Sequence, residues 1–168
     1  MEANSEIATK IIQSAFYMTT ATCADNVPWI SPTIFWTDDK LSFYLVSHID
    51  SRHIQQIEKN NKVAVSIYDS TQPEGTGRGL QFGGTATVLK DENEMSNAIK
   101  WLFLQRLSNE GKMEDFISEK QKIYKNNNRF IAKIDIDKEG IFINEWDGKD
   151  YRVPVKVPSD IKLKQFRK

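Results

Sequence analysis

The residues with the clearest chemistry in this sequence are Ser51, Arg52 and His53, within the segment HIDSRHIQQIEKNNKVAVSIYD (residues 48–69). They stand at the predicted start of a short amphipathic helix. A helix start presents unpaired backbone N–H groups and about half a positive charge, so it is a favourable place for an anion such as phosphate. A hydroxyl, a guanidinium fork and an imidazole add donors at the same place. The alternative is that Ser51 only caps the helix and Arg52 is solvated.

The other chemically capable residues do not form a catalytic or metal-binding set in the sequence. His48 and His53 are the only histidines and have no cysteine partner nearby, so we expect no metal site. Cys23 is the only cysteine and cannot form an internal disulfide, so we interpret it as an ordinary thiol. The carboxylates within residues 114–119 fit a solvated helix face better than an acid–base pair. No nucleophile with a base and an orienting group can be assembled, so no catalytic residue is assigned.

The composition is typical of one globular domain, which we expect to span residues 1–168. Lys plus Arg and Asp plus Glu both count 23, so the formal net charge is zero. A neutral chain has no overall field that would attract nucleic acid or an anionic membrane. The N-terminal stretch lacks a signal-peptide pattern, and no stretch reaches the roughly 18 apolar residues of a membrane span. We therefore expect a cytoplasmic protein with no nucleic-acid or membrane partner.

The spacing of apolar residues predicts antiparallel β structure with helices at three places. A helix is expected over residues 4–15, a second after Ser51, and a helical insertion at about residues 92–127. Strands are expected over residues 16–22, 28–37, 41–47, 62–69, 80–89, 129–137 and 141–146, with a short one after residue 148. The strands at 129–137 and 141–146 are expected to form a hairpin. The Gly83-Gly84 pair predicts a bulge or the close approach of another group.

Large apolar side chains occur on both faces of two central strands. In residues 28–37 one face carries Ile30, Pro32, Ile34 and Trp36, and the other carries Trp29, Ser31, Thr33 and Phe35. Residues 41–47 also have large groups on both sides. A small closed barrel has only one interior, so a helix, a ligand or a second subunit must cover the outer face. We expect a homodimer.

Four sequence features together resemble the pyridoxamine 5′-phosphate oxidase-like FMN-binding split-barrel superfamily. They are a strand ending in a short loop, Ser-Arg-His-x-x-x-Ile, Asn-Asn-Lys-Val-x-Val, and the strand GLQFGGTATVL. The resemblance covers roughly residues 15–89 and the closing hairpin. It implies a mainly β fold with flanking α-helices, a six-stranded antiparallel split β-barrel with peripheral helices, which forms a homodimer and binds FMN at the interface. The helical insertion is not part of the minimal barrel, and the oxidase's pyridoxal-phosphate region has no clear counterpart. The resemblance is therefore to small members rather than to the vitamin B6 oxidase itself.

The resemblance also implies which residues bind the flavin. Ser51, Arg52 and His53 would hold the phosphate. His53 replaces a lysine of the oxidase, so its charge would depend on pH, and phosphate affinity is expected to weaken above neutral pH. The ring would lie beside Ser31, Pro32, Thr33 and Ile34, with further contacts from Val46 and Ser47. A polar side chain would reach the flavin from the second subunit; Gly79 aligns at that position, and the nearby Gln81 is the substitute candidate.

The function implied is that of an FMN-binding flavoprotein, an oxidoreductase that acts on a small molecule with NADH or NADPH as electron donor. The flavin would carry the electrons, while the protein supplies position, donors near the ring and exclusion of water. Three alternatives stay open. The first is a haem-binding relative with His48 or His53 as axial ligand, the second is a deazaflavin-using reductase, and the third is a non-catalytic flavin-binding or sensing protein.

Overall fold

A computed structural model of the chain describes residues 3–107, 112–146, 150–158 and 161–163. In chain order the elements are α1 (Asn4–Ser14), β1 (Tyr17–Ala24), β2 (Val27–Thr37), β3 (Phe43–His48), α2 (Arg52–Lys59), β4 (Lys62–Tyr68), β5 (Gly79–Val88), α3 (Glu92–Arg106), α4 (Met113–Asn126), β6 (Arg129–Trp146) and β7 (Asp150–Val155). The three predicted helical regions are confirmed, and the insertion consists of α3 and α4. None of the helices in the described ranges is long and apolar enough to cross a membrane.

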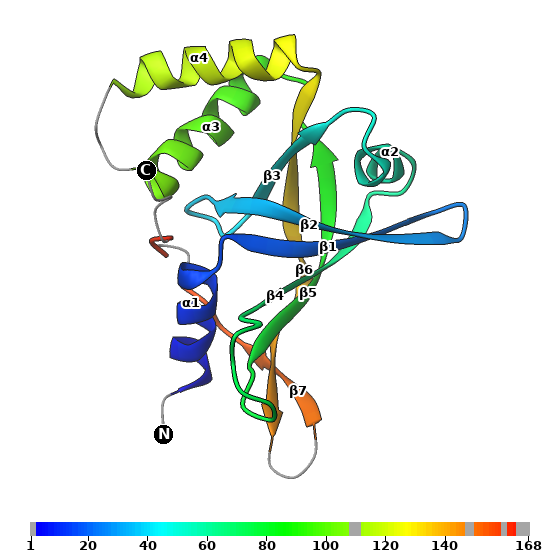
Figure 1. Cartoon of the computed structure of the whole chain (residues 1–168), viewed down its shortest axis with the longest axis vertical. Coiled ribbons are helices and arrows are strands. Elements are labelled where there is room, and N and C mark those ends of the chain that lie inside the picture. The colour runs from blue at the N-terminus through cyan, green and yellow to red at the C-terminus, as the bar shows by residue number, and fades with distance from the viewer. Residues whose placement is uncertain (1–2, 108–111, 147–149, 159–160, 164–168) are drawn as a thin grey trace.

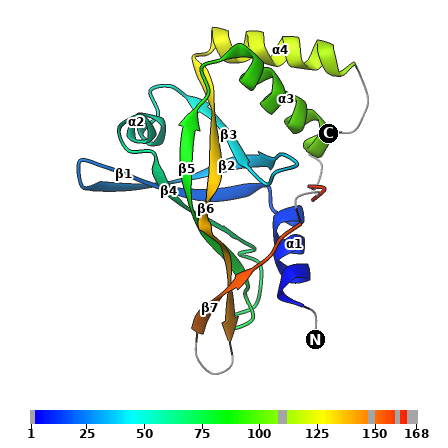
Figure 2. The ribbon, with the colours of Figure 1, turned by 180° about the vertical axis from the view of Figure 1, so that it is seen from behind.

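Six strands close into a barrel, and a seventh extends the sheet beyond it. The strand order is β3-β2-β1-β4-β5-β6-β7, and β3 also pairs with β6. This extra pairing closes the barrel, so the prediction of a six-stranded antiparallel split barrel is confirmed. The second half of β6 and β7 continue away from the α3–α4 end, as the two opposite views show (Figures 1 and 2).

The predicted hairpin at residues 129–146 is wrong, because β6 is one strand of 18 residues. Both of its halves pair with the same long strand β5, and the register shifts where Ile136 lies opposite Gly84 and Ile141 lies opposite Phe82. The residues between Ile136 and Ile141 therefore bulge out instead of reversing the chain. Gly140 supports the bulge with a φ of 79°, a conformation that favours glycine.

The Gly83-Gly84 pair lies at this register shift, as predicted. A Cβ atom at Gly84 would lie 2.6 Å from Cγ2 of Ile134 and 2.9 Å from the backbone oxygen of Asp135. Both distances are shorter than real Cβ contacts, so β6 can approach β5 this closely only because residue 84 is a glycine.

The barrel interior is built from the inward residues of alternating strands. The rings of Phe35 and Phe43 have centroids 5.7 Å apart, and those of Phe43 and Phe82 have centroids 4.8 Å apart. On the outside, α3 covers one end of β2, where the indole Nε1 of Trp36 donates to the backbone oxygen of Ala98 at 2.8 Å. The helical insertion therefore covers part of the outer apolar face of β2.

A buried arginine fastens α3 to the barrel. Arg106 has no exposed surface, and its guanidinium donates to the backbone oxygen of Phe35 at 2.8 and 3.0 Å and to that of Ala15 at 3.0 Å. Burial lowers the pKa of Arg106 to about 10, so the side chain stays charged at neutral pH.

Candidate functional site

The start of α2 forms as the sequence predicts, but Ser51 acts differently from an ordinary cap. Ser51 is the N-cap residue, yet its side chain accepts no hydrogen bond from the first turn of the helix. Its hydroxyl instead donates to the backbone oxygen of His48 at 2.7 Å and accepts from Oγ of Ser47 at 3.0 Å. The first-turn N–H groups are therefore left for an external acceptor, and no acidic residue stands in that turn.

Arg52 is exposed beside the helix start and is held by an aromatic ring. Its Cζ atom lies 4.4 Å from the ring centroid of Trp29 on β2, a cation–π contact. The contact restrains the guanidinium while leaving it accessible, which is suitable for binding an anion. Sequence reasoning missed this role of Trp29, although the strand alternation places Trp29 on the same face as Ser31.

His53 is buried behind the helix start and connects it to β2. It is 7% exposed, its Nδ1 lies 3.1 Å from Oγ of Ser31, and its Nε2 lies 3.4 Å from Oγ of Ser51. Because the proton of Ser51 goes to a backbone oxygen, Nε2–H is the donor toward Ser51. In the neutral imidazole, Nδ1 then accepts from the hydroxyl of Ser31.

The environment of His53 agrees with that assignment. Burial lowers the pKa of His53 below its ordinary 6.5, because the charged form loses hydration. Burial therefore moves the predicted pH-dependent charge of His53 to lower pH. At neutral pH the uncharged imidazole positions Ser51 and Ser31, and Arg52 is the basic side chain beside the helix start.

The stretch Ser31–Ile34 divides between the two faces of β2. Ser31 and Thr33 share the inner face, as expected, whereas Pro32 and Ile34 are exposed on the outer face. Within the described residues the buried hydroxyls of Thr20 and Thr33 have no hydrogen-bond partner. Thr20 lies opposite Ser31 across β1 and β2, so polar groups gather on this inner face.

The neighbouring strand β3 contributes two of the predicted residues. Ser47 joins the chain of hydrogen bonds through Ser51. Val46 is half-buried and packs against the hydrophobic core.

Gln56 is a positioning residue of α2 that sequence reasoning missed. Its Oε1 accepts from Oγ1 of Thr22 at 2.6 Å, and its Nε2 donates to the backbone oxygen of Val27 at 2.8 Å. These two bonds fix α2 against the β1–β2 hairpin. The spacing of three residues from His53, on the same side as Ile57, was the available signal.

Gln81 lies apart from the start of α2. Its Oε1 accepts from Nε of Arg152 at 3.0 Å, and with Ile30 and Phe142 it lines a hollow of 570 Å³. Within one copy of the chain, the structure therefore joins Ser31, Ser47, Ser51 and His53 by hydrogen bonds but does not bring Gln81 to them.

Apolar side chains are exposed on the adjoining surface of β2, β1 and β4, which we call the outer sheet face. Its large members are Tyr17 (58% exposed), Ile30 (65%), Ile34 (38%) and Tyr68 (57%), with Pro32 between them. Ile34 lies opposite Tyr17 and Pro32 lies opposite Thr19, so these residues form one continuous surface. Exposed apolar surface of this kind is typical of interaction sites.

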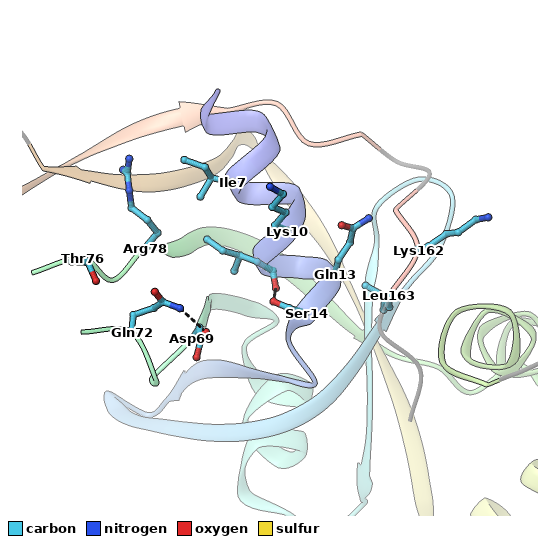
Figure 3. Close-up of a pocket in the computed structure, with 11 residues that line it drawn as sticks. Ile7, Lys10, Gln13, Ser14, Asp69, Gln72, Thr76, Arg78, Lys162 and Leu163 are labelled. Carbon is cyan, nitrogen blue, oxygen red and sulfur yellow. Dashed lines mark hydrogen bonds between the residues drawn. The ribbon is translucent and has the colours of Figure 1, made fainter. Parts of the chain in front are cut away.

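Another hollow, of 630 Å³, lies between α1, the loop after β4 and the segment at Lys162. Figure 3 shows the side chains that line it. The carboxylate of Asp69 at its edge accepts bonds from the hydroxyl of Thr71 at 2.6 Å and from Nε2 of Gln72 at 2.9 Å. The hydrogen bonds from these two residues lower the pKa of Asp69 to about 2. Since none of the predicted site residues lines this hollow, it is separate from the α2 site.

Comparison with known proteins identifies the family. The family model described as pyridoxamine 5′-phosphate oxidase matches residues 5–137. The chain belongs to the pyridoxamine 5′-phosphate oxidase family. The matched range contains every predicted site residue and the helical insertion, and it ends within β6. Among curated proteins, none matches the chain.

Three solved structures share the fold of this pyridoxamine 5′-phosphate oxidase family member. HutZ, a haem storage protein from Vibrio cholerae, is 18% identical with a TM-score of 0.66, over 85% of this chain and 95% of that one. A haem-binding protein from Mycobacterium smegmatis is 13% identical with a TM-score of 0.65, over 92% and 59%. An FAD-binding protein from Mesorhizobium loti is 15% identical with a TM-score of 0.56, over 84% and 94%. At these identities the likeness shows the fold alone.

Proposed function

We propose that this protein binds FMN and that the start of α2 holds the phosphate. The observation that carries the proposal is the helix start itself, where Ser51 leaves the first-turn N–H groups uncapped and Arg52 is held accessible over Trp29. The nearest carboxylate in sequence, Asp50, turns toward His48, with 3.4 Å between Oδ2 and Nδ1. The donor set therefore suits a phosphate, and family membership favours a flavin as its carrier.

The remaining predicted residues would hold the flavin ring. The ring would lie along Ser31–Ile34, with Val46 and Ser47 beside it. The imidazole of His53 would hold the hydroxyls of Ser31 and Ser51 in position. Bound FMN would supply electron transfer from NADH or NADPH, as the donor, to a small molecule, as the acceptor. The protein would contribute orientation, hydrogen-bond donors and exclusion of water.

We further propose that a second copy of the chain covers the outer sheet face. The exposed side chains of Tyr17, Ile30, Ile34 and Tyr68 would otherwise stay in contact with water. A partner on this face would bring its own Gln81, which lines the adjoining hollow with Ile30, toward the groove between the copies. The homodimer would thus supply the polar group that one copy lacks at its α2 site.

Substitution of Arg52 tests the proposed function. Arg52→Ala should weaken FMN binding by about tenfold to a hundredfold, because a charge-assisted hydrogen bond contributes about 1.5–3 kcal/mol. Fluorescence titration of each protein with FMN measures the affinities. The control is Lys59→Ala at the other end of α2, where the ammonium pairs with Asp25. Equal affinities for wild type and Arg52→Ala would remove the phosphate from this helix start.

Haem is the second candidate ligand, because two of the similar folds belong to haem proteins. His53 is unsuited to be the axial ligand, since it is buried and both ring nitrogens are engaged. His48 is about half exposed, so it is the residue to test. The absorbance spectrum of protein purified without added cofactor separates the candidates: a Soret band that His48→Ala abolishes indicates haem, and flavin bands indicate FMN. A deazaflavin spectrum, or flavin binding without oxidation of NADH or NADPH, would select one of the other two alternatives.

A further inference from the structure

A cationic cavity of 410 Å³ lies within the helical insertion, between the segment before α3, the helix α4 and the first residues of β6. Figure 1 shows α4 crossing above α3 and running into the start of β6 at this place. The basic side chains that line it are Lys90, Lys122, Lys125 and Arg129, and the acidic one is Glu92. Four positive charges against one negative charge leave the lining at +3, whereas the whole chain has a net charge of zero.

Most of this charge is not neutralised by the protein. Lys90 pairs with Glu58 at 3.1 Å. In the described part of the chain, Lys122, Lys125 and Arg129 form no ion pair with a carboxylate. Lys125 lies in the last turn of α4, where its charge interacts favourably with the helix dipole. Arg129 lies on a strand, so the helix dipole does not explain its presence. The basic side chains come from the segment before α3, from α4 and from β6. Stabilisation of the end of α4 alone would not explain basic residues on all three.

The same cavity has an apolar wall. Met95 and Phe130 are half-buried and offer accessible surface, and Tyr124 is 5% exposed and forms part of the wall. Burial raises the pKa of the Tyr124 hydroxyl, although the charge of Arg129 opposes this effect. The hydroxyl therefore stays protonated at neutral pH and adds no negative charge to the lining.

We propose that this cavity binds a nucleotide with two or more phosphate groups. The cations would neutralise the phosphates, and the base would pack on Phe130 and Met95. A bare phosphate ion would leave the apolar wall uncovered, and an uncharged aromatic molecule would leave the cations unused. A volume of 410 Å³ is within the range of about 300–1,000 Å³ that is usual for small-ligand sites. This proposal does not depend on the flavin site at α2.

Calorimetric titration of the full chain with ADP tests the proposal. ADP should bind saturably and more weakly as salt is raised, and adenosine should bind much more weakly than ADP. The variant Lys122→Ala/Lys125→Ala should weaken ADP binding by about 3- to 30-fold, as two exposed charge contacts predict. The control is Lys100→Ala, an exposed lysine of the same insertion that does not line the cavity.

Two results of the ADP titrations would overturn the proposal. One is the absence of saturable ADP binding, and the other is equal ADP affinity for the double variant and the Lys100→Ala control. FMN provides a separate check, because it also combines a phosphate with an aromatic ring. Excess FMN should leave ADP bound if the two sites are distinct. One-for-one displacement of ADP by FMN would assign this cavity to the flavin and refute a separate nucleotide site.

Discussion

The neutral, buried state of His53 makes a specific prediction about stability and pH. In the folded protein the neutral imidazole of His53 lies between the hydroxyls of Ser31 and Ser51, and protonation of Nδ1 would reverse its hydrogen bond with Ser31. The pKa of the folded state lies below the ordinary 6.5, because burial disfavours the charged form. The unfolded chain therefore binds the proton more readily, and stability must fall as pH drops below about 6.5.

The size of the effect follows from linkage. One pH unit below the ordinary pKa, protonation stabilises the unfolded chain by about 1.4 kcal/mol and the folded chain by less. The wild type should thus lose up to about 1.4 kcal/mol between neutral pH and that point, with no loss from this residue above neutral pH. His53→Gln cannot titrate, and its amide can replace only part of the hydrogen bonding, so at neutral pH it should be less stable by about 1 kcal/mol.

Urea unfolding of wild type and His53→Gln between about pH 5.5 and 8 measures the difference directly. His48 is present in both proteins, so any contribution from it cancels in the comparison. The stability gap should shrink as the pH falls. A constant gap would mean that His53 titrates alike in both states, and a widening gap would mean that the folded state favours the charged imidazole. Either result would refute the positioning role, and the second would restore His53 as a charge at the phosphate site.

Three further variants examine the fold and the assembly. Gly84→Ala should lower the free energy of unfolding by about 1–3 kcal/mol in urea titrations, because its Cβ would meet Ile134 and the backbone of Asp135. Gly83→Ala is the matched control, since a Cβ at residue 83 would meet only the end of a side chain, at 3.3 Å. Arg106→Leu should cost about 2–5 kcal/mol by the same assay, because the backbone oxygens of Phe35 and Ala15 lose their buried donor. A loss below about 1 kcal/mol would contradict this role. The double variant Ile30→Lys/Ile34→Lys should convert a dimer to a monomer in light scattering, with the fold retained by circular dichroism; a wild type that is monomeric would reject the homodimer.

The helices and extended stretches were predictable from the sequence, because the spacing of apolar residues determines them. The pairing of the strands was not predictable in the same way. Alternation in residues 129–137 and 141–146 identifies two extended stretches, and Lys138-Glu139-Gly140 suits a turn as well as a bulge. What excludes the hairpin is the length of β5, which pairs with both halves of β6. That is information from another segment of the chain, and a local pattern does not contain it.

The candidate site shows the same division at the level of single residues. The position of Ser51 at the helix start was predictable, because capping residues have a strong preference for that place. The direction of its hydroxyl was not, since it depends on the backbone of His48 and on Ser47. The burial of His53 had a usable signal: it stands four residues before Ile57, on the buried side of α2.

The cationic cavity shows why a charge count over the whole chain is a weak guide to binding. Net charge determines the field far from the protein, and at zero net charge that field is weak. A ligand in contact with the lining instead experiences the charges within about one Debye length, roughly 8 Å at physiological salt. At that range the attraction of a bound anion to Lys122, Lys125 and Arg129 is reduced little by distant carboxylates. The neutrality of the chain therefore argues against long nucleic-acid surfaces but is compatible with a compact polyanion held in the insertion.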